Sequence, residues 1–408
     1  MQSVGVYVSI PFCKAKCTFC NFASGVFAGQ SQAAYIERIC TEIESASDDA
    51  ARLGFALPSA ADTLYLGGGT PSLLEPAAIE RIFAALRGRF LLDTQAEITV
   101  ECAPGQLEDR TLEAYQRHGV NRISLGVQSF IDEEAAAVGR LHTGAMCRAE
   151  IDRLRRAGVA SVGLDLIVGL PRQTAASWRF SLEQAIESGV DHVSVYMLEV
   201  DEDSRLGREA LAGGARYGAG ALADEEQVAD LYLEACERLG AAGLEQYEIS
   251  NFARAGFRSR HNLKYWRREP YVGFGLDAHS MLRRGQGGLR WANDATMQTY
   301  LAGELVGLGN PARTAEFASQ RGYDPVSDEL AFEEEIFLGL RLNEGMNLTQ
   351  LRKSYGRERC DEVSAAALEA ADAGYVVLTS EGARLTPRGR LASNEVFGRL
   401  LEQERVYA

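Results

Sequence analysis

Residues 4–22 read VGVYVSIPFCKAKCTFCNF, an apolar run followed directly by a loop that holds three cysteines. The run VGVYVSI is almost continuously apolar, which is typical of a strand covered on both faces of a parallel sheet. Cys13, Cys17 and Cys20 follow it, four and then three residues apart. This spacing suits three thiolates that reach one metal centre from a single loop, so the loop is the first candidate for a functional site.

Five more runs of this kind alternate with helical patterns along the chain. The predicted strands are residues 63–67, 97–101, 121–127, 161–171 and 192–198. This alternation predicts an α/β fold whose parallel strands form a partial (β/α)6 barrel of the TIM type. A full eight-unit barrel would need two further units, which are not evident in the sequence. Because the loops after the strands of such a barrel form its catalytic face, we expect the cysteine loop to lie there.

The chain is predicted to divide into three parts. Residues 1–285 form the core barrel with its connecting elements, residues 286–330 an irregular connector, and residues 331–408 a C-terminal domain. The C-terminal domain is predicted to be mostly helical and similar to a winged helix, with a small hairpin around Glu381-Gly382. Residues 201–225 are rich in glycine and charge and follow the sixth strand, which favours a mobile loop that covers the site.

Composition and charge argue against several classes of protein. The 408 residues carry a net charge of −15, and an acidic chain is a poor candidate for binding nucleic acid. No apolar run of about eighteen residues appears, so no membrane span is predicted, and the first ten residues do not resemble a secretory signal. We therefore expect a cytoplasmic protein with reduced thiols. The scattered cysteines are interpreted as packing residues: Cys40, Cys102, Cys147, Cys236 and Cys360.

Three interpretations of the cysteine loop differ in the metal that it binds. A structural zinc ion takes four ligands, and all the histidines lie far from the loop in sequence, so zinc would need a remote fourth ligand. A [4Fe–4S] cluster held by three thiolates leaves one iron open for another ligand, which fits the loop better. A cysteine loop that binds no metal is the third interpretation.

The segment CKAKCTFC, residues 13–20, resembles the CxxxCxxC signature of the radical S-adenosylmethionine (SAM) superfamily. In that superfamily the open iron of a [4Fe–4S] cluster chelates the amino and carboxylate groups of SAM. An electron from the reduced cluster then breaks a C–S bond of SAM to give a 5′-deoxyadenosyl radical, while the protein holds SAM and excludes water. The resemblance implies Cys13, Cys17 and Cys20 as cluster ligands, and an electron donor such as a flavodoxin or ferredoxin.

The same resemblance implies which residues bind SAM. The GGGTP turn resembles the segment that contacts the amino group of SAM, and Arg140 is implied to pair with its carboxylate. Glu101 is implied to contact the ribose or methionine moiety, and Asp165 would be costly to bury without a partner. Tyr7 and Phe19 flank the cysteine loop and are expected to shield the cluster or pack on the adenine. The implied SAM contacts are Tyr7, Phe19, Gly68, Gly69, Thr70, Glu101, Gln128, Arg140 and Asp165.

Further segments resemble the branch of the superfamily that contains oxygen-independent coproporphyrinogen III oxidase and the haem chaperone HemW. They include YVSIPFC, LYLGGGTPS, NRISLGVQSF, LDLIVGLP, YEISNFAR and HNLKYWRREPYVGFG. Phe22 stands where the oxidase carries an added cysteine, and the first strand begins almost at Met1, where the oxidase has an N-terminal extension. Ser9 stands where the family usually has a histidine, which argues against radical catalysis on a porphyrinogen. These differences favour the chaperone.

The HNLKYW segment, residues 261–266, resembles the HNxxYW segment of the chaperone branch. From the residues alone, a lone histidine in a polar loop is interpreted as a surface residue. Because histidine is the usual protein ligand of haem iron, the resemblance makes His261 the leading candidate for haem contact. Tyr265 and Trp266 are expected to pack on the macrocycle.

Taken together, the resemblance implies a haem chaperone that binds haem, a [4Fe–4S] cluster and exchangeable SAM. Such a protein transfers haem to an acceptor protein, for which respiratory proteins are candidates. One alternative is an oxygen-independent coproporphyrinogen III oxidase, a radical SAM enzyme of porphyrin biosynthesis that carries out oxidative decarboxylation. Another alternative is a radical SAM methyltransferase or ring-opening enzyme that acts on tetrapyrroles.

Overall fold

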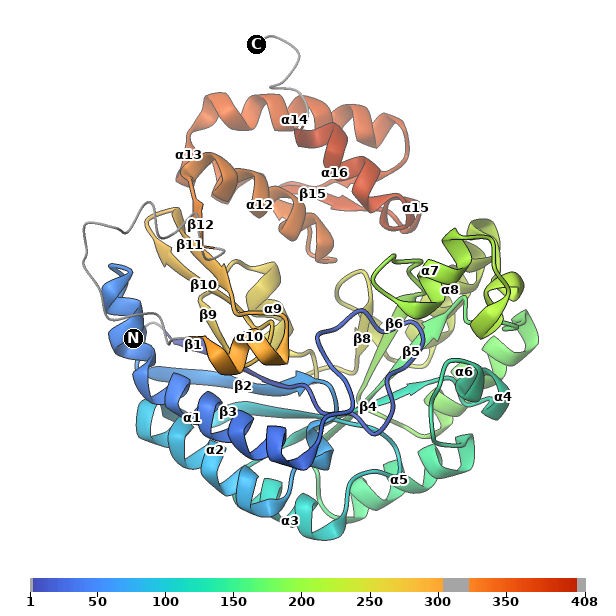
Figure 1. The fold of residues 1–408 in the computed structure, drawn as a ribbon. Helices are drawn as coiled ribbons and strands as arrows, with labels where there is room; N and C mark the ends of the chain where they lie inside the picture. Colours follow the sequence, from blue (N-terminus) through green and yellow to red (C-terminus); the bar gives the residue numbers. More distant parts are fainter. Residues whose placement is uncertain (1–2, 304–322, 402–408) are drawn as a thin grey trace.

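The computed structural model describes residues 3–303 and 323–401, and its largest element is one twelve-stranded sheet (Figure 1). The strands lie in the order β12-β11-β10-β9-β1-β2-β3-β4-β5-β6-β8-β7. All neighbouring pairs from β1 to β6 are parallel, as the predicted (β/α)6 arrangement requires. Their bounds are β1 Val4–Ile10, β2 Ala60–Gly68, β3 Leu91–Cys102, β4 Arg122–Gln128, β5 Ser161–Val168 and β6 His192–Met197.

Helices connect these strands and cover the outer face of the curved sheet (Figure 1). They are α1 Gly29–Arg52, η1 Pro71–Leu73, α2 Pro76–Arg89, α3 Asp109–Arg117, α4 Asp132–Ala137, α5 Gly144–Arg156 and α6 Ala175–Glu187. The alternation of strand and helix confirms the predicted α/β class. The segment after β6 adds α7 Arg205–Leu211, η2 Arg216–Ala221 and α8 Glu225–Ala241.

Short strands, rather than further βα units, extend the sheet at both edges. β9 pairs with β1 in parallel, and the other added pairs are antiparallel. The elements of these edges are β7 Glu245–Gln246, β8 Asn251–Ala253, α9 Arg260–Trp266, β9 Tyr271–Phe274, β10 His279–Arg284, β11 Gly287–Ala292, α10 Met297–Ala302 and β12 Tyr323–Val326. The prediction of irregular structure over residues 286–330 is wrong for β11, α10 and β12, because pairing with β10 orders β11 and pairing with β11 orders β12. The rest of that interval includes residues 304–322, which lie outside the described residues.

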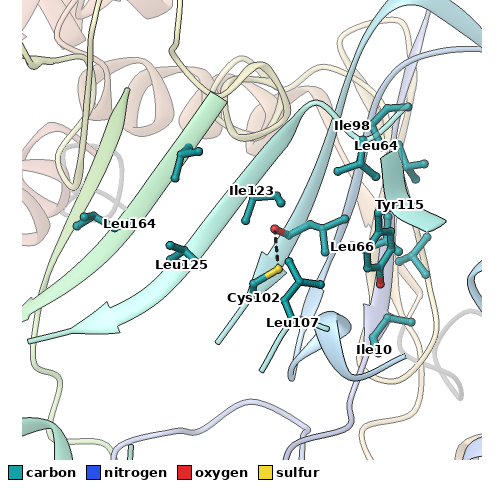
Figure 2. Close-up of a cluster of buried hydrophobic side chains, with 14 of the residues drawn as sticks. Ile10, Leu64, Leu66, Ile98, Cys102, Leu107, Tyr115, Ile123, Leu125 and Leu164 are labelled. Atoms are coloured by element: carbon teal, nitrogen blue, oxygen red, sulfur yellow. Dashed lines mark hydrogen bonds between the residues drawn. The ribbon is translucent and has the colours of Figure 1, made fainter. Parts of the chain in front are cut away.

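The main core lies between the sheet and its outer helices. Figure 2 shows part of it, where Ile10, Leu64, Leu66 and Ile98 meet Tyr115 of α3. All five side chains are buried, and the Tyr115 hydroxyl donates to the Pro71 carbonyl at 2.7 Å. Because successive side chains of a strand point to opposite faces, the residues between these apolar ones face the interior of the open barrel.

A smaller unit with its own hydrophobic core follows at the C-terminal end. Its elements are α12 Asp328–Arg341, β13 Met346–Asn347, α13 Leu348–Tyr355, α14 Arg357–Asp372, β14 Val376–Leu378, β15 Gly382–Leu385, α15 Pro387–Leu391 and α16 Ser393–Leu401. The three strands form an antiparallel sheet, and the β14–β15 hairpin turns where the sequence predicts it. The unit is therefore mostly helical with a small hairpin, as expected. The boundaries at residues 285 and 330 stay a prediction. No helix within the described residues is long and apolar enough to span a membrane.

Candidate functional site

The cysteine loop follows β1 and lies over the carboxyl ends of the parallel strands. Backbone bonds fix it at two points, because Cys13 N donates to the Gly25 carbonyl at 2.9 Å and Thr18 N donates to the Val138 carbonyl at 3.0 Å. Cys13, Cys17 and Cys20 all line one cavity of about 410 Å³, a size typical of small-molecule sites. The structure therefore brings the three predicted ligands to a single site.

Each of the three thiols lies close to a polar side chain of the cavity. Thr70 Oγ1 lies 3.7 Å from Cys13 Sγ, Ser24 Oγ lies 3.7 Å from Cys20 Sγ, and Arg140 Nη1 lies 3.5 Å from Cys17 Sγ. Among the described residues, no three Cys, His, Asp or Glu side chains are arranged to hold one metal ion. A cluster places each thiolate on a different iron, so its ligands lie farther apart than those of one zinc ion. This donor set fits a [4Fe–4S] cluster better than zinc.

The glycine turn after β2 packs against the start of the cysteine loop. Gly68 has a φ of +100°, a conformation that side-chain-bearing residues rarely adopt. A β-carbon on Gly69 would lie 2.7 Å from both the Ile10 carbonyl oxygen and the Pro11 carbonyl carbon. Gly68, Gly69 and Thr70 all line the cavity, so close backbone approach at this turn forms part of its wall.

Glycine at position 69 is expected to be essential for this wall. We predict that Gly69→Ala lowers the affinity for SAM at least about tenfold and destabilises the fold by about 1 to 3 kcal/mol, because backbone atoms must move to admit the methyl group. Equilibrium dialysis against SAM on cluster-loaded protein measures the first effect. The matched control is Gly88→Ala, since an added β-carbon there meets nothing within 4 Å. Equal SAM affinity in the two variants would contradict this account of the turn.

Two carboxylates face the cavity from β3 and β5, with β4 between the two strands. Glu101, next to the last residue of β3, accepts from the Tyr65 hydroxyl at 2.8 Å and from Gly68 N at 3.1 Å. Burial, with Asp165 as a further cause, raises the pKa of Glu101 to about 7. Ser124 Oγ lies 3.4 Å from Asp165, and burial raises the pKa of Asp165 as well. A ligand that carries a positive charge or several hydroxyl groups would stabilise the ionised forms of these two buried carboxylates.

The raised pKa of Glu101 predicts a pH-dependent stability. The folded state binds the proton of Glu101 more tightly than the unfolded chain does. The resulting stabilisation of the folded state is fully present below about pH 4.5 and is lost as the pH rises through about 7. Over that range the free energy of unfolding of the wild type should fall by at most about 3 kcal/mol relative to Glu101→Gln. Chemical denaturation of cluster-loaded, SAM-free protein tests this. Glu113→Gln, at an exposed position of α3, should leave the wild-type pH profile unchanged.

Gln128 and Arg140 close the far wall of the cavity. Gln128 ends β4 with a φ of +65°, beside a register shift in the β4–β5 pairing. Arg140 donates to the Gly126 carbonyl as well as lying near Cys17. Within the described part of the chain, Gln128 Oε1 and Arg140 Nε are buried without a hydrogen-bond partner. Buried polar atoms without partners are unfavourable, so they fit a site that a polar ligand such as SAM would complete.

The segment over residues 201–225 is folded against the cysteine loop. It contains α7 and η2, where a mobile loop was predicted. Leu206 N donates to the Thr18 carbonyl at 2.8 Å, and Asn21 Nδ2 donates to Asp201 Oδ2 at 2.7 Å. Figure 1 shows α7 close to the loop that follows β1. Its position supports the predicted role in covering the site.

The structure adds cavity residues that the sequence reasoning did not single out. They are contributed mainly by the end of β6 and the residues after it: Tyr196, Met197, Leu198, Glu199 and Asp201. The signal was present, because residues at the carboxyl end of a barrel strand lie at the catalytic face. Cys102, interpreted only as a packing residue, is buried and also lines the cavity.

Two predicted site residues do not line this cavity. Tyr7 faces the barrel interior beneath it, where its ring lies 6.0 Å from the ring of Tyr65. His261 is 1% exposed, so the expectation of a surface histidine is wrong. Thr63 Oγ1 lies 2.8 Å from its Nδ1, and the Tyr265 hydroxyl lies 2.8 Å from its Nε2. Burial lowers the pKa of His261 to about 3, so its ring is neutral. In this conformation neither nitrogen is open to a haem iron.

Comparisons with known proteins agree with this geometry. The model of the Radical SAM superfamily matches residues 7–185, and that of the HemN C-terminal domain matches residues 326–392. "Heme chaperone HemW" of Bacillus subtilis is 32% identical over 398 residues, which cover 97% of this chain and 98% of that protein. This chain belongs to the HemW family of radical SAM proteins. Membership implies a [4Fe–4S] cluster and SAM as cofactors.

Other HemW relatives are equally similar in sequence. "Heme chaperone HemW" of Lactococcus lactis is 32% identical over 349 residues, covering 86% of this chain and 84% of that protein. Among solved structures, coproporphyrinogen III oxidase HemN from Escherichia coli, a radical SAM enzyme, matches with a TM-score of 0.76 at 22% identity. The match covers 98% of this chain and 90% of that chain. At this identity the HemN likeness establishes a shared fold and does not transfer its reaction to a HemW-family chain.

Proposed function

We propose that this protein is a haem chaperone, which binds haem alongside a SAM-liganded [4Fe–4S] cluster and passes the haem to an acceptor protein. The observation that carries the proposal is the 32% identity to a HemW protein along nearly the whole of both chains. Phe22 supports it, because this 64% exposed side chain stands where the oxidase carries an added cysteine. Ser9 also supports it, since its short hydroxyl replaces a titratable imidazole beside the glycine turn.

The residues of the cavity divide into three roles in this proposal. The thiolates of Cys13, Cys17 and Cys20 hold the cluster, which supplies an open iron for the amino and carboxylate groups of SAM and a one-electron centre. Arg140 binds a carboxylate, because its guanidinium lies beside Cys17 with Nε unpaired within the described residues. Gly68 and Gly69 bring main-chain groups to the ligand.

The remaining polar groups orient SAM and hold its charge. Glu101 and Asp165 face the ligand from β3 and β5 and accept hydrogen bonds from hydroxyl groups. A sulfonium cation near them would favour their ionised forms and so lower the raised pKa of each. Phe19 lines the same cavity and excludes water from it. None of these roles requires turnover of SAM, so the site is compatible with a structural or regulatory use of the cofactor.

Anaerobic turnover assays test the proposal against the enzyme alternatives. Protein with a reconstituted cluster is incubated with reductant, SAM and coproporphyrinogen III, and 5′-deoxyadenosine and protoporphyrinogen are quantified. The proposal predicts no protoporphyrinogen above the level of a cluster-free control, while the same sample binds haem. Multiple turnovers to protoporphyrinogen would overturn it in favour of the oxidase. Stoichiometric binding of two SAM molecules per chain would favour a methyltransferase.

A further inference from the structure

A cleft separate from the cluster cavity lies between α9 and the C-terminal unit. It consists of two adjoining hollows of about 380 and 570 Å³, and Trp266 at the end of α9 lines both. Neither hollow shares a lining residue with the cluster cavity. Each falls within the size range of small-molecule sites. The cleft is therefore a second candidate site, built jointly by the radical SAM unit and the C-terminal unit.

The first hollow presents an aromatic wall. Trp266 faces it together with Phe337 of α12 and Phe397 of α16, and the two phenylalanine rings lie 6.1 Å apart. Each of the three rings is only partly buried, so part of its face is open to the hollow. The guanidinium of Arg341 stacks 4.3 Å above the Trp266 ring and forms one border. Large planar rings gain most from such a wall, through apolar burial and offset stacking.

The second hollow is basic. Arg267, Arg268 and Arg283 line it, against the single acidic side chain of Glu335. Arg283 approaches Glu335 only at 3.8 Å and its side chain is 26% exposed, so it has capacity for another anion. Arg267 is paired with Glu344, and Arg268 with Glu334 and Glu335, so Arg283 is the side chain of this wall that is best placed to bind a carboxylate of a ligand. An aromatic hollow and a basic hollow thus lie side by side, joined by one indole ring.

Two buried donors in the cleft lack partners. Trp266 Nε1 and Arg268 Nη2 are buried without a hydrogen-bond partner among the residues that the structure describes. Arg268 is 1% exposed, and its other nitrogens donate to Glu334, to Glu335 and to the Gln286 carbonyl. The charge of Arg268 is compensated by two carboxylates, but a buried N–H donor without an acceptor, such as its Nη2, is still unfavourable. The donors therefore point independently to a ligand with acceptor oxygens.

We propose that this cleft binds a planar, largely apolar molecule bearing carboxylates, the chemical class to which haem and its metal-free porphyrin belong. The macrocycle lies against Trp266, Phe337 and Phe397, and the carboxylates reach the basic hollow near Arg283. The identification of haem as the occupant rests on the proposed function. His261, on the same helix as Trp266, does not line either hollow and has both ring nitrogens engaged. The cleft therefore holds the macrocycle by its faces and carboxylates, without an iron ligand from that residue.

Titration of the full-length, cluster-loaded protein with three probes tests the cleft. The probes are haemin, metal-free protoporphyrin IX and the dimethyl ester of protoporphyrin IX. Trp266→Ala should weaken binding of haemin and protoporphyrin IX at least about tenfold, whereas Trp291→Ala, at a partly buried tryptophan outside the cleft, should change it less than about twofold. Arg283→Gln should weaken binding of the two diacids and leave the ester unaffected.

Each outcome decides one part of the inference. If Trp266→Ala and Arg283→Gln both bind haemin and protoporphyrin IX with wild-type affinity, the proposal that the cleft binds these molecules is overturned. If Trp266→Ala loses its cluster or its cooperative unfolding, Phe397→Leu replaces it, and an unchanged affinity there would overturn the aromatic wall. Haemin bound without sensitivity to any cleft variant would overturn the cleft and leave the proposed function standing. Failure of the wild type to bind haemin while the cleft variants alter protoporphyrin IX binding would overturn the proposed function alone.

Discussion

Replacing Cys17 with serine is expected to abolish the iron–sulfur cluster and, with it, the binding of SAM. The loop supplies only three thiolates, so the loss of one leaves too few ligands, and Arg140 loses its neighbour on the cavity wall. Iron content after anaerobic reconstitution should fall from about four atoms per chain to near zero. Absorbance of the cluster and SAM dialysis on the same sample measure both losses.

The matched control for this change is Cys236→Ser, a substitution at a partly buried cysteine of α8 outside the cavity. It should keep the full iron content and the wild-type affinity for SAM. Equal iron content in Cys17→Ser and wild type would show that another residue completes the metal site. That result would contradict the three-thiolate assignment.

Glu334→Ala is expected to cause the largest loss of stability at the junction of the two units. Glu334 lies 2.7 Å from Arg268 Nε and 2.7 Å from Arg290 Nη1, and both Glu334 and Arg268 are buried. Removal of the carboxylate leaves the Arg268 guanidinium buried with much less compensation, which typically costs about 3 to 5 kcal/mol. Urea unfolding should show this loss, and hydrogen exchange should show that it is concentrated in α12.

The matched control uses an ion pair at the same junction that faces solvent. Glu344 lies 2.8 Å from Arg258 and 3.4 Å from Arg267, and its side chain is 54% exposed. Glu344→Ala should cost less than about 1 kcal/mol, because exposed pairs contribute little. Similar losses of unfolding free energy in Glu334→Ala and Glu344→Ala would mean that burial does not determine how strongly these ion pairs stabilise the junction.

Local patterns in the sequence were enough to predict the central strands and the cysteine loop. VGVYVSI and SVGLDLIV, which form β1 and β5, are nearly continuous in apolar residues because helices cover their outer face and the barrel interior encloses the other. The cysteines, the glycine turn and Glu101 then meet at one cavity because parallel strands end at the same face. For these residues, the order of the strands along the chain was enough to predict that the side chains lie close together.

Features that depend on distant contacts were not predictable in this way. β12 is ordered by pairing with β11, which lies far before it in the chain, whereas β11 forms a hairpin with its sequence neighbour β10, a local feature that was not predicted. His261 sits in a polar segment that reads as surface, yet Thr63 and Tyr265 enclose it. The helical turn of α7 was interpreted as a mobile loop, because its anchor is the backbone of the cysteine loop far away in sequence. For β12, His261 and α7, a decisive partner is remote along the chain: β11, Thr63 and the cysteine loop.

The most direct test of the central claim is an equilibrium haem titration of the anaerobically reconstituted wild-type protein, with iron and SAM quantified before and after. The proposed chaperone function predicts saturable binding of about one haem per chain, with cluster content and SAM binding unchanged. Binding that never saturates, or haem uptake only as the cluster is lost, would contradict the claim that one chain carries both groups.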